Sequence, residues 1–342
     1  MQCPQEGYFL DLIRMSREVL QAPQERNFNE LLEQRQISAN TLLCVGLDPD
    51  YSNEKFPASI KSQFPNDPPA AILELNKQII NGSNLSACAY KLQSSFYEEF
   101  GSRGLEVLQD TIAWINKTDP TIPVIWDAKR GDIGNTNKGY VKAADLLKAD
   151  AMTVNPYLGS AFFNDSGQVQ LDTMRPFLER KNKGVIVLAK TSNIDGGEFQ
   201  DLPVDLKNLS ENYKKKFGDM NELREIVGKD IVPVYQILAY RVSHYWNANG
   251  NCALVVGATY PGELAEVRKI VGDKMEILVP ALGKSQGGRP EDLAKGFDSR
   301  KRGVIANLSR AIDFPDVNQG EIFVQAVGRV AMEWRDAINV YR

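Results

Sequence analysis

The stretch IPVIWDAKRGDIG, residues 122–134, joins a short apolar run to a closely spaced set of charged residues. The run at 122–127 is typical of a buried β-strand. Since alternate residues of a strand share a face, we expect Asp127 and Lys129 on one side, with Asp132 where the chain turns toward a helix. Because burying unpaired charges is costly, this array indicates either a functional site or a structural ion pair at a strand end.

Apolar runs separated by helical patterns recur along the rest of the chain. The runs lie at 42–47, 87–92, 122–127, 151–154, 185–189, 253–256, 276–279 and 304–306, and helical patterns lie at 71–81, 104–117, 140–147 and 262–271. This alternation is typical of parallel strands joined by right-handed crossovers. Eight units predict an α/β fold of the (β/α)₈ TIM-barrel type. A doubly wound open sheet is the alternative, although no GxGxxG follows the first run.

Two further segments are expected to decorate this barrel. Residues 1–40 predict an N-terminal helical extension, with an amphipathic period through Phe9, Leu10, Leu12, Ile13, Met15, Leu31 and Leu32. Residues 194–241 predict a helical insert between strands 5 and 6. The three lysines at 214–216 are expected to lie on a solvated face of a helix in this insert. Residues 51–69, rich in Pro, Asn and Ser, predict a loop or short excursion. We treat residues 1–342 as a single domain.

Composition limits the classes of partner. The chain of 342 residues has a net charge of −4, which argues against nucleic acid as the main partner. No apolar run approaches the ~18 residues of a membrane span, so no membrane is expected as a partner. The first residues do not resemble a signal peptide, and the four cysteines are scattered, so we expect a cytoplasmic protein with reduced thiols. The single histidine, His244, cannot build a His-based metal cluster.

Polar side chains follow seven of the eight predicted strands. In a TIM barrel the active site lies at the carboxyl ends of the strands, so these side chains are predicted to converge. In chain order they include Asp48, Lys91, Asp127, Lys129, Asp132, Asn155, Tyr157, Lys190, Ser192, Gln286 and Arg310. The loops after strands 7 and 8 commonly bind phosphate, and Gly283, Gly287 and Gly288 allow close approach of backbone to an anion. The absence of GxxxxGK[ST] excludes a nucleoside-triphosphate P-loop.

These motifs, in this order, resemble the orotidine 5'-monophosphate decarboxylase family, in particular its longer bacterial-type (type 2) branch. The resemblance spans roughly residues 40–315. It is carried by DxKxxDI from Asp127, GLDP at 46–49, KTSN at 190–193, QGG at 286–288 and SRxI at 309–312. The DxKxxD core is shared with sugar-phosphate decarboxylases and synthases of the same superfamily.

The resemblance implies roles for individual residues. It assigns Lys91, Asp127, Lys129 and Asp132 to a catalytic charge network, with Asp132 and Thr136 reaching into the partner's site across a homodimer interface. It also implies substrate-binding and pocket-lining roles. Asp48 and Lys91 would hold the ribose hydroxyls, and Ser192 would bind the pyrimidine edge. Gln286 and Arg310 would bind the phosphate, and the loop around Gly287 would close over it as a lid. Asn155 and Tyr157 would line the pocket.

The implied reaction converts orotidine 5'-monophosphate to UMP in de novo pyrimidine synthesis, through a C6 carbanion that Lys129 protonates. It requires no metal and no organic cofactor. Three alternatives stay open: a related sugar-phosphate lyase that uses Mg²⁺, a barrel that binds nucleotide without chemistry, and a Schiff-base aldolase.

Overall fold

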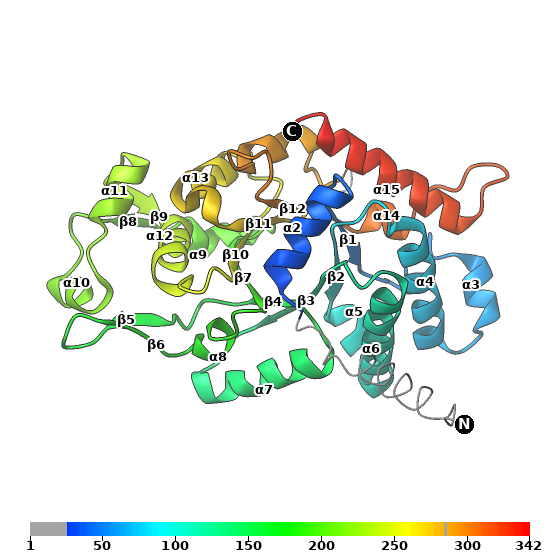
Figure 1. The fold of residues 1–342 in the computed structure, drawn as a ribbon, viewed down its shortest axis with the longest axis horizontal. Coiled ribbons are helices and arrows are strands. Elements are labelled where there is room, and N and C mark those ends of the chain that lie inside the picture. The colour runs from blue at the N-terminus through cyan, green and yellow to red at the C-terminus, as the bar shows by residue number, and fades with distance from the viewer. Residues whose placement is uncertain (1–25, 284–285) are drawn as a thin grey trace, which may run out of the picture.

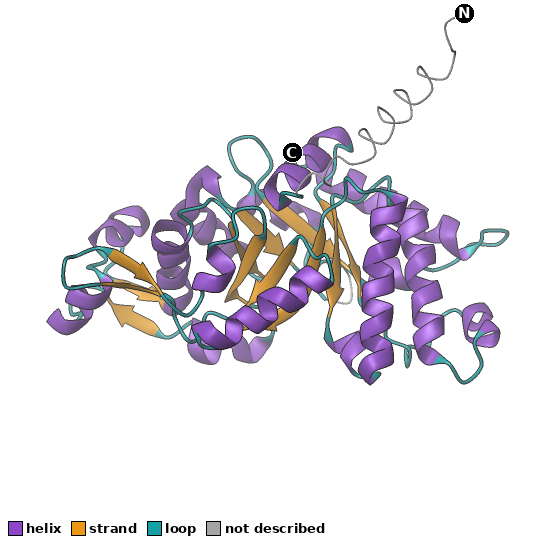
Figure 2. Ribbon diagram, turned by 60° about the horizontal axis from the view of Figure 1, so that its bottom comes forward, coloured by secondary structure: helices purple, strands orange, loops and turns teal. Residues whose placement is uncertain are grey.

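The computed structural model describes residues 26–283 and 286–342, and in them eight parallel strands close into a barrel (Figures 1 and 2). Around the barrel these are β1 (Leu43–Leu47), β2 (Ala89–Gln93), β3 (Val124–Arg130), β4 (Ala151–Val154), β7 (Gly184–Lys190), β10 (Cys252–Val256), β11 (Glu276–Val279) and β12 (Val304–Leu308). The first and last strands pair through Leu43 and Ala306. This closure confirms the TIM barrel and excludes the open sheet.

Helices surround the strands, as Figure 2 shows. The longer ones are α4 (Pro68–Ser83), α6 (Gly101–Thr118), α7 (Gly134–Leu146), α12 (Val234–Arg241), α13 (Pro261–Val271) and α15 (Phe323–Asn339). They include the four helices that the sequence predicts. The start of α4 follows a strong local signal, because the side chain of Asp67 accepts the N–H of Ala70 and prolines occupy the first turn.

The amino-terminal end of the barrel is closed by helix α2 (Phe28–Ser38). Its Phe28 and Leu32 are 1% exposed and belong to the same apolar cluster as Ile125 and Ile186 inside the barrel. Gly184 has no room for a Cβ, which would lie 2.4 Å from the Phe28 ring. Helix α2 confirms the second part of the predicted helical extension. The first part, Phe9, Leu10, Leu12, Ile13 and Met15, lies outside the described residues.

The insert after β7 is more varied than the sequence predicts. Residues 194–241 contain η1 (Ile194–Gly196), α9 (Gly197–Gln200), α10 (Glu211–Phe217) and α11 (Asn221–Val227), as well as a small antiparallel sheet of β8 (Pro203–Asp205) and β9 (Ile231–Pro233), and end in α12. A second small sheet, β5 (Ala161–Phe163) with β6 (Val169–Leu171), follows β4 and was not predicted. Strands of three residues are too short to show a periodic pattern.

The remaining elements are short. They are α3 (Ala58–Gln63) within the predicted loop at 51–69, α5 (Ser95–Glu98), α8 (Arg175–Leu178), the π-helical turn η2 (Val242–Trp246), η3 (Gly272–Lys274), η4 (Pro290–Gly296) and α14 (Arg310–Asp313). Within the described ranges, no helix combines the length and apolar character that a membrane crossing requires. Cys44, Cys88 and Cys252 are buried free thiols, and burial raises the pKa of Cys44 to about 12.

Candidate active site

A chain of alternating charges crosses the carboxyl ends of β1, β2 and β3. The ammonium of Lys91, a residue only 4% exposed, lies 3.0 Å from Oδ2 of Asp127 and 3.6 Å from Oδ1 of Asp48. On the other side of Asp127, Oδ1 accepts a hydrogen bond of 2.8 Å from Lys129 Nζ. The structure therefore brings four of the predicted residues into one contiguous array, in the order Asp48, Lys91, Asp127, Lys129.

The end of β3 is distorted to build this array. Lys129 has a φ of 49°, in the left-handed region, and the register with β4 shifts between Trp126 and Arg130. The Lys129 N–H donates to Oγ1 of Thr153 at 2.9 Å, and that hydroxyl donates to Asp127 at 2.7 Å. Thr153 thus couples the backbone of one charged residue to the carboxylate of the other. Left-handed backbone at a non-glycine residue costs on the order of 1 kcal/mol and is common at functional sites.

The electrostatic surroundings stabilise the charged forms of the two buried members. Burial by itself would raise the pKa of Asp127, but Lys91, Lys129 and the hydrogen bond from Thr153 lower it well below the ordinary value. Burial would likewise lower the pKa of Lys91, yet the flanking carboxylates of Asp48 and Asp127 raise it. A carboxylate and an ammonium are therefore both held ionised where little water reaches them.

A buried carboxyl group that the sequence analysis missed lies beside Asp48. Asp313, at the end of α14, is completely buried, and its Oδ2 accepts the N–H of Asp48 at 3.3 Å. In the described part of the chain, Oδ1 of Asp313 and Oδ1 of Asp48 accept no hydrogen bond. Burial, reinforced by the charge of Asp48, raises the pKa of Asp313 well above its ordinary value. Neither Asp313 nor Thr153 had a spacing signal, because each lies within a predominantly apolar segment.

Asp132 and Thr136 lie apart from this array. Within the described residues Asp132 forms no ion pair, and its Oδ1 accepts the N–H of the next residue, Ile133, at 2.6 Å. The buried Asn137 fixes the turn, since its side chain accepts the N–H of Asp132 and donates to the Asp132 and Thr173 carbonyls. Thr136 is exposed on the first turn of α7. Within the described residues, neither Asp132 nor Thr136 contacts Lys129 of the same chain.

The predicted phosphate residues follow β11 and β12. Gln286, Gly287 and Arg310 are exposed, and the last of these opens α14 directly after β12. Gly283 and Gly287 have φ values of 105° and 94°, which only glycine adopts readily. Their N–H groups, and that of Gly288, donate to carbonyls inside the loop. The glycines therefore shape the turn, and the side chains of Gln286 and Arg310 remain as donors for an anion.

The other predicted residues occupy the strand ends between these regions. Ser192 is exposed just beyond β7, and Asn155 is exposed beyond β4, where its N–H donates to the Arg130 carbonyl at 2.8 Å. Tyr157 is 82% exposed and lines a separate cavity of about 400 Å³ between the segment after β4 and helices α10 and α12. The described contacts do not connect Tyr157 with the charged array.

The sequence and the barrel are similar to those of known proteins. The family described as "Orotidine 5'-phosphate decarboxylase / HUMPS family" matches residues 41–313. The orotidine 5'-phosphate decarboxylase of Janthinobacterium is 40% identical over an alignment that spans 89% of this chain and 95% of the relative. That of Cellvibrio japonicus is 39% identical over 92% of this chain and 99% of the relative. The solved Leishmania donovani OMP decarboxylase superposes with a TM-score of 0.68 at 30% identity, covering 92% of this chain and 98% of its own. The chain belongs to the orotidine 5'-phosphate decarboxylase / HUMPS family.

Proposed function

We propose that this chain decarboxylates orotidine 5'-monophosphate to UMP in de novo pyrimidine synthesis, without a cofactor, as an enzyme of the longer bacterial-type branch. The observation that carries the proposal is the array Asp48, Lys91, Asp127, Lys129, in which carboxylates and ammonium groups alternate at the carboxyl ends of adjacent strands. The names of the relatives support the substrate.

The array suits a reaction that removes a carboxylate and leaves an electron pair on carbon. Asp127 would lie beside the departing carboxylate, and two like charges ~4 Å apart at an effective dielectric of about 20 repel by about 4 kcal/mol. As carbon dioxide leaves, the negative charge moves to C6, where the Lys129 ammonium stabilises it and then donates a proton. Lys91 balances Asp127, so that Lys129 remains available to the substrate.

The remaining polar strand ends would bind the rest of the nucleotide. We assign the ribose hydroxyls to Asp48 and Lys91, the pyrimidine edge to Ser192, and the phosphate to Gln286 and Arg310. Arginine presents a planar set of donors that matches phosphate oxygens. Binding energy from the phosphate would favour closure of the loop around Gly287 only over a complete substrate. Asn155 and Tyr157 are proposed as more distant pocket lining.

We further propose a cytoplasmic homodimer in which Asp132 and Thr136 complete the partner's site. The exposure of Thr136, and the absence of an ion pair at Asp132 among the described residues, support the arrangement. Mixing inactive Lys129→Ala chains with inactive Asp132→Ala chains should then restore activity, because each mixed dimer contains one intact site. Random exchange predicts recovery of about a quarter of the unmodified activity. Lack of recovery after exchange has been verified by mass spectrometry would contradict shared sites.

The decarboxylase proposal is tested by following the absorbance of orotidine 5'-monophosphate with the purified chain in the presence of a chelator. Rapid loss of the substrate absorbance with formation of UMP is expected. Turnover that requires added Mg²⁺ would favour the sugar-phosphate lyase alternative. Binding of UMP without turnover by the folded, unmodified chain would favour a nucleotide-binding barrel.

A further inference from the structure

The last residue of β7 is a buried lysine that the proposed chemistry does not use. Lys190 is 1% exposed, and its Nζ donates to both carboxylate oxygens of Asp201, at 2.7 and 2.6 Å. The same ammonium lies 4.5 Å from the centre of the Tyr260 ring. A buried ammonium needs such partners, and Asp201 comes from the insert rather than from the barrel. The insert therefore supplies, through Asp201, the negative charge that pairs with Lys190 at the carboxyl end of β7.

The next residue is held by the insert through two hydrogen bonds. The N–H of Thr191 donates to Oε1 of Gln200 at 2.9 Å, and Nε2 of Gln200 donates to Oγ1 of Thr191 at 2.8 Å. One amide side chain thus fixes both the backbone and the hydroxyl of Thr191. Gln200 ends α9 and Asp201 follows it directly, so a single short element binds two successive residues of the strand end.

Ser192 comes next, and the barrel holds its backbone from the other side. A Cβ at Gly257, beyond β10, would lie 2.9 Å from both Cα and Cβ of Ser192. The N–H of Gly257 donates to the Lys190 carbonyl at 2.8 Å. Ser192 is exposed, and within the described residues its hydroxyl makes no hydrogen bond, so it is available to a ligand.

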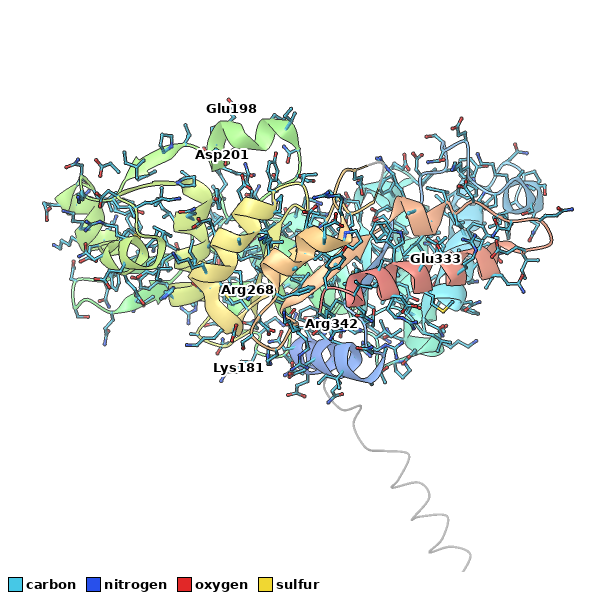
Figure 3. All side chains as sticks on the ribbon, turned by 90° about the horizontal axis from the view of Figure 1, so that it is seen from above. Lys181, Glu198, Asp201, Arg268, Glu333 and Arg342 are labelled. Atoms are coloured by element: carbon cyan, nitrogen blue, oxygen red, sulfur yellow. The ribbon has the colours of Figure 1, made fainter. Side chains whose placement is uncertain are left out.

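The segment that follows α9 is tied to α12, the last helix of the insert. The carbonyl of Leu202, just after Asp201, accepts the N–H of Val234 at the start of α12 at 3.1 Å. Figure 3 shows Glu198 and Asp201 at the end of the molecule opposite to α2, which closes the amino-terminal end of the barrel. The segment around Gln200 and Asp201 is therefore bonded both to the end of β7 and to α12.

We propose that Gln200 and Asp201 are positioning residues that hold Lys190, Thr191 and Ser192 so that the Ser192 hydroxyl meets the edge of a pyrimidine base. The insert after β7 thereby sets the affinity for the base half of the substrate, while the loops after β11 and β12 bind the phosphate half. This inference rests on the proposed function, because it takes the role of Ser192 from it. Neither Gln200 nor Asp201 is expected to touch the substrate.

The test compares a ligand that has a base with one that lacks it. In Gln200→Ala, the Kd for UMP and the KM for orotidine 5'-monophosphate should rise about tenfold, since one positioned hydrogen bond to the base is lost. The Kd for ribose 5-phosphate should stay within about twofold. Asp201→Asn should also raise the Kd for UMP and the KM for orotidine 5'-monophosphate, by a smaller factor, and leave the Kd for ribose 5-phosphate within about twofold. Glu198→Ala, on the exposed side of α9, is the matched control and should change the Kd of neither ligand.

Two further measurements separate positioning from a general structural role. If Gln200 acts through Ser192, then Gln200→Ala should have little effect on UMP affinity in a Ser192→Ala background. Gln200→Glu keeps an acceptor for the Thr191 N–H and should recover most of the lost affinity.

Equal weakening of UMP and ribose 5-phosphate, or additive effects with Ser192→Ala, would overturn the inference. So would unchanged UMP affinity in both Gln200→Ala and Asp201→Asn when the unmodified chain is active. An unmodified chain that neither binds UMP nor decarboxylates orotidine 5'-monophosphate would instead refute the proposed function, and the inference with it.

Discussion

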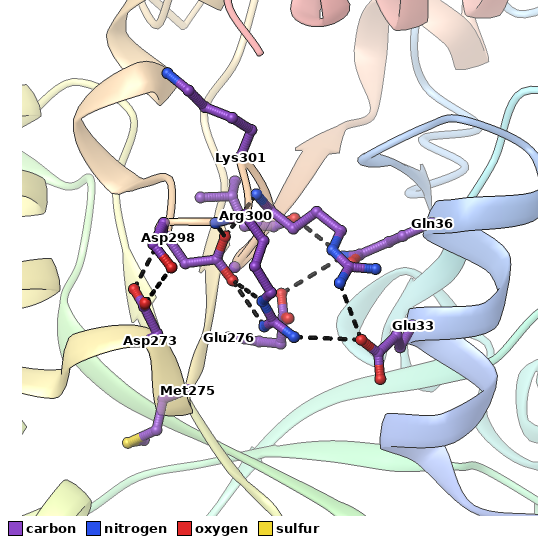
Figure 4. Close-up of polar contacts among 12 residues, drawn as sticks. Glu33, Gln36, Asp273, Met275, Glu276, Asp298, Arg300 and Lys301 are labelled. Atoms are coloured by element: carbon purple, nitrogen blue, oxygen red, sulfur yellow. Dashed lines mark hydrogen bonds and ion pairs between the residues drawn. The ribbon is translucent and has the colours of Figure 1, made fainter.

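The two ends of the barrel both contain buried charged groups, but they satisfy them to different degrees. At the amino-terminal end, Arg300 lies 2.7 Å from Asp298 and 3.3 Å from Glu33 of α2 (Figure 4). Nearby, Arg268 is 8% exposed and donates to the carbonyls of Gly296, Gly272, Met275 and Gly303. No member of this amino-terminal network is among the described residues that bury a side-chain polar atom without a hydrogen bond.

The carboxyl-terminal end leaves buried acceptors without a hydrogen bond, although one of them, Oδ1 of Asp48, lies 3.6 Å from the Lys91 ammonium. Oδ1 of Asp48, Oδ1 of Asn307 and Oδ1 of Asp313 are buried, and none accepts a hydrogen bond within the described residues. Lys129 adds a left-handed backbone to the same region. A saturated network stabilises the fold, whereas unsaturated acceptors and strained backbone reduce stability and are retained where a ligand makes use of them. The contrast distinguishes the Arg268 and Arg300 network at the amino-terminal end from the charged array at the carboxyl-terminal end.

The largest expected effect is loss of catalysis at the carboxyl-terminal end. Lys129→Ala removes the proposed proton donor and should lower kcat/KM for orotidine 5'-monophosphate by at least about 10³-fold, with little loss of stability. Substrate absorbance and chemical denaturation measure the two quantities. Lys148→Ala is the matched control, because Lys148 also has a left-handed φ, of 58°, but is exposed after α7. Comparable activity of the two variants would remove Lys129 from the mechanism.

The amino-terminal end should show the reverse behaviour. Arg268→Met keeps the apolar stem but leaves buried carbonyls without donors, so the free energy of unfolding should fall by about 3 kcal/mol. The kcat/KM of the folded fraction should be unchanged. Arg175→Met breaks an exposed pair with Glu179 and should cost no more than about 0.5 kcal/mol. A catalytic defect in folded Arg268→Met would contradict the division between the two ends.

A smaller effect concerns pH. Because burial and the charge of Asp48 raise the pKa of Asp313, the folded protein binds its proton more tightly than the unfolded chain. The stability from this group is present below the ordinary carboxyl pKa and is lost as pH rises toward the raised value. Asp313→Asn should therefore be more stable than the parent near pH 7, by about 1 kcal/mol or more, and equal to it near pH 4.

The exposed Asp316 provides a control of opposite sign for that titration. A hydrogen bond from Lys55 lowers the pKa of Asp316, so any stability it contributes is present above the ordinary carboxyl pKa and is lost as pH falls. Urea denaturation between pH 4 and pH 7 measures the free energy of unfolding of Asp313→Asn and of the control, Asp316→Asn. If the difference between Asp313→Asn and the parent does not change with pH, then Asp313 does not titrate differently in the folded and unfolded states.

The smallest expected effect isolates the backbone strain at the active site. Lys129→Gly should be more stable than Lys129→Ala by about 1 kcal/mol, because glycine tolerates the left-handed φ. At Lys142, inside α7, the order should reverse, since glycine disfavours a helix by about 1 kcal/mol relative to alanine. The same order at both positions would show that Lys129 is not strained.

The sequence predicts the barrel and its helices well because their signals are local and repeated. The eight strands are continuous apolar runs because both of their faces are buried, and the helices between them show the period of burial on one face. The hairpin β5–β6, the pair β8–β9 and helix α3 were missed because each is too short to show a period. The polar strand ends were also local signals, which is why Asp48, Lys91, Asp127 and Lys129 were found together.

Residues with no local signal were missed at the site. Thr153 lies within an apolar strand, and Asp313 follows an isoleucine in a short helix. Each has meaning only through what it touches: the N–H of Lys129 and carboxylate of Asp127 for Thr153, and the backbone of Asp48 for Asp313. That Asp132 serves a partner, and that Ser192 meets a base, stay predictions.

By itself, the sequence of this protein determined the barrel, its order of strands and the charged residues at their ends. The physical reason is that strand and helix periods, and the position of a residue after a strand, are properties of neighbouring residues. Only the tertiary structure decided that Lys129 adopts a left-handed backbone, that Asp313 is buried against Asp48, and that the insert forms hydrogen bonds with the end of β7. Those features depend on contacts between residues far apart in the chain, which no local pattern encodes.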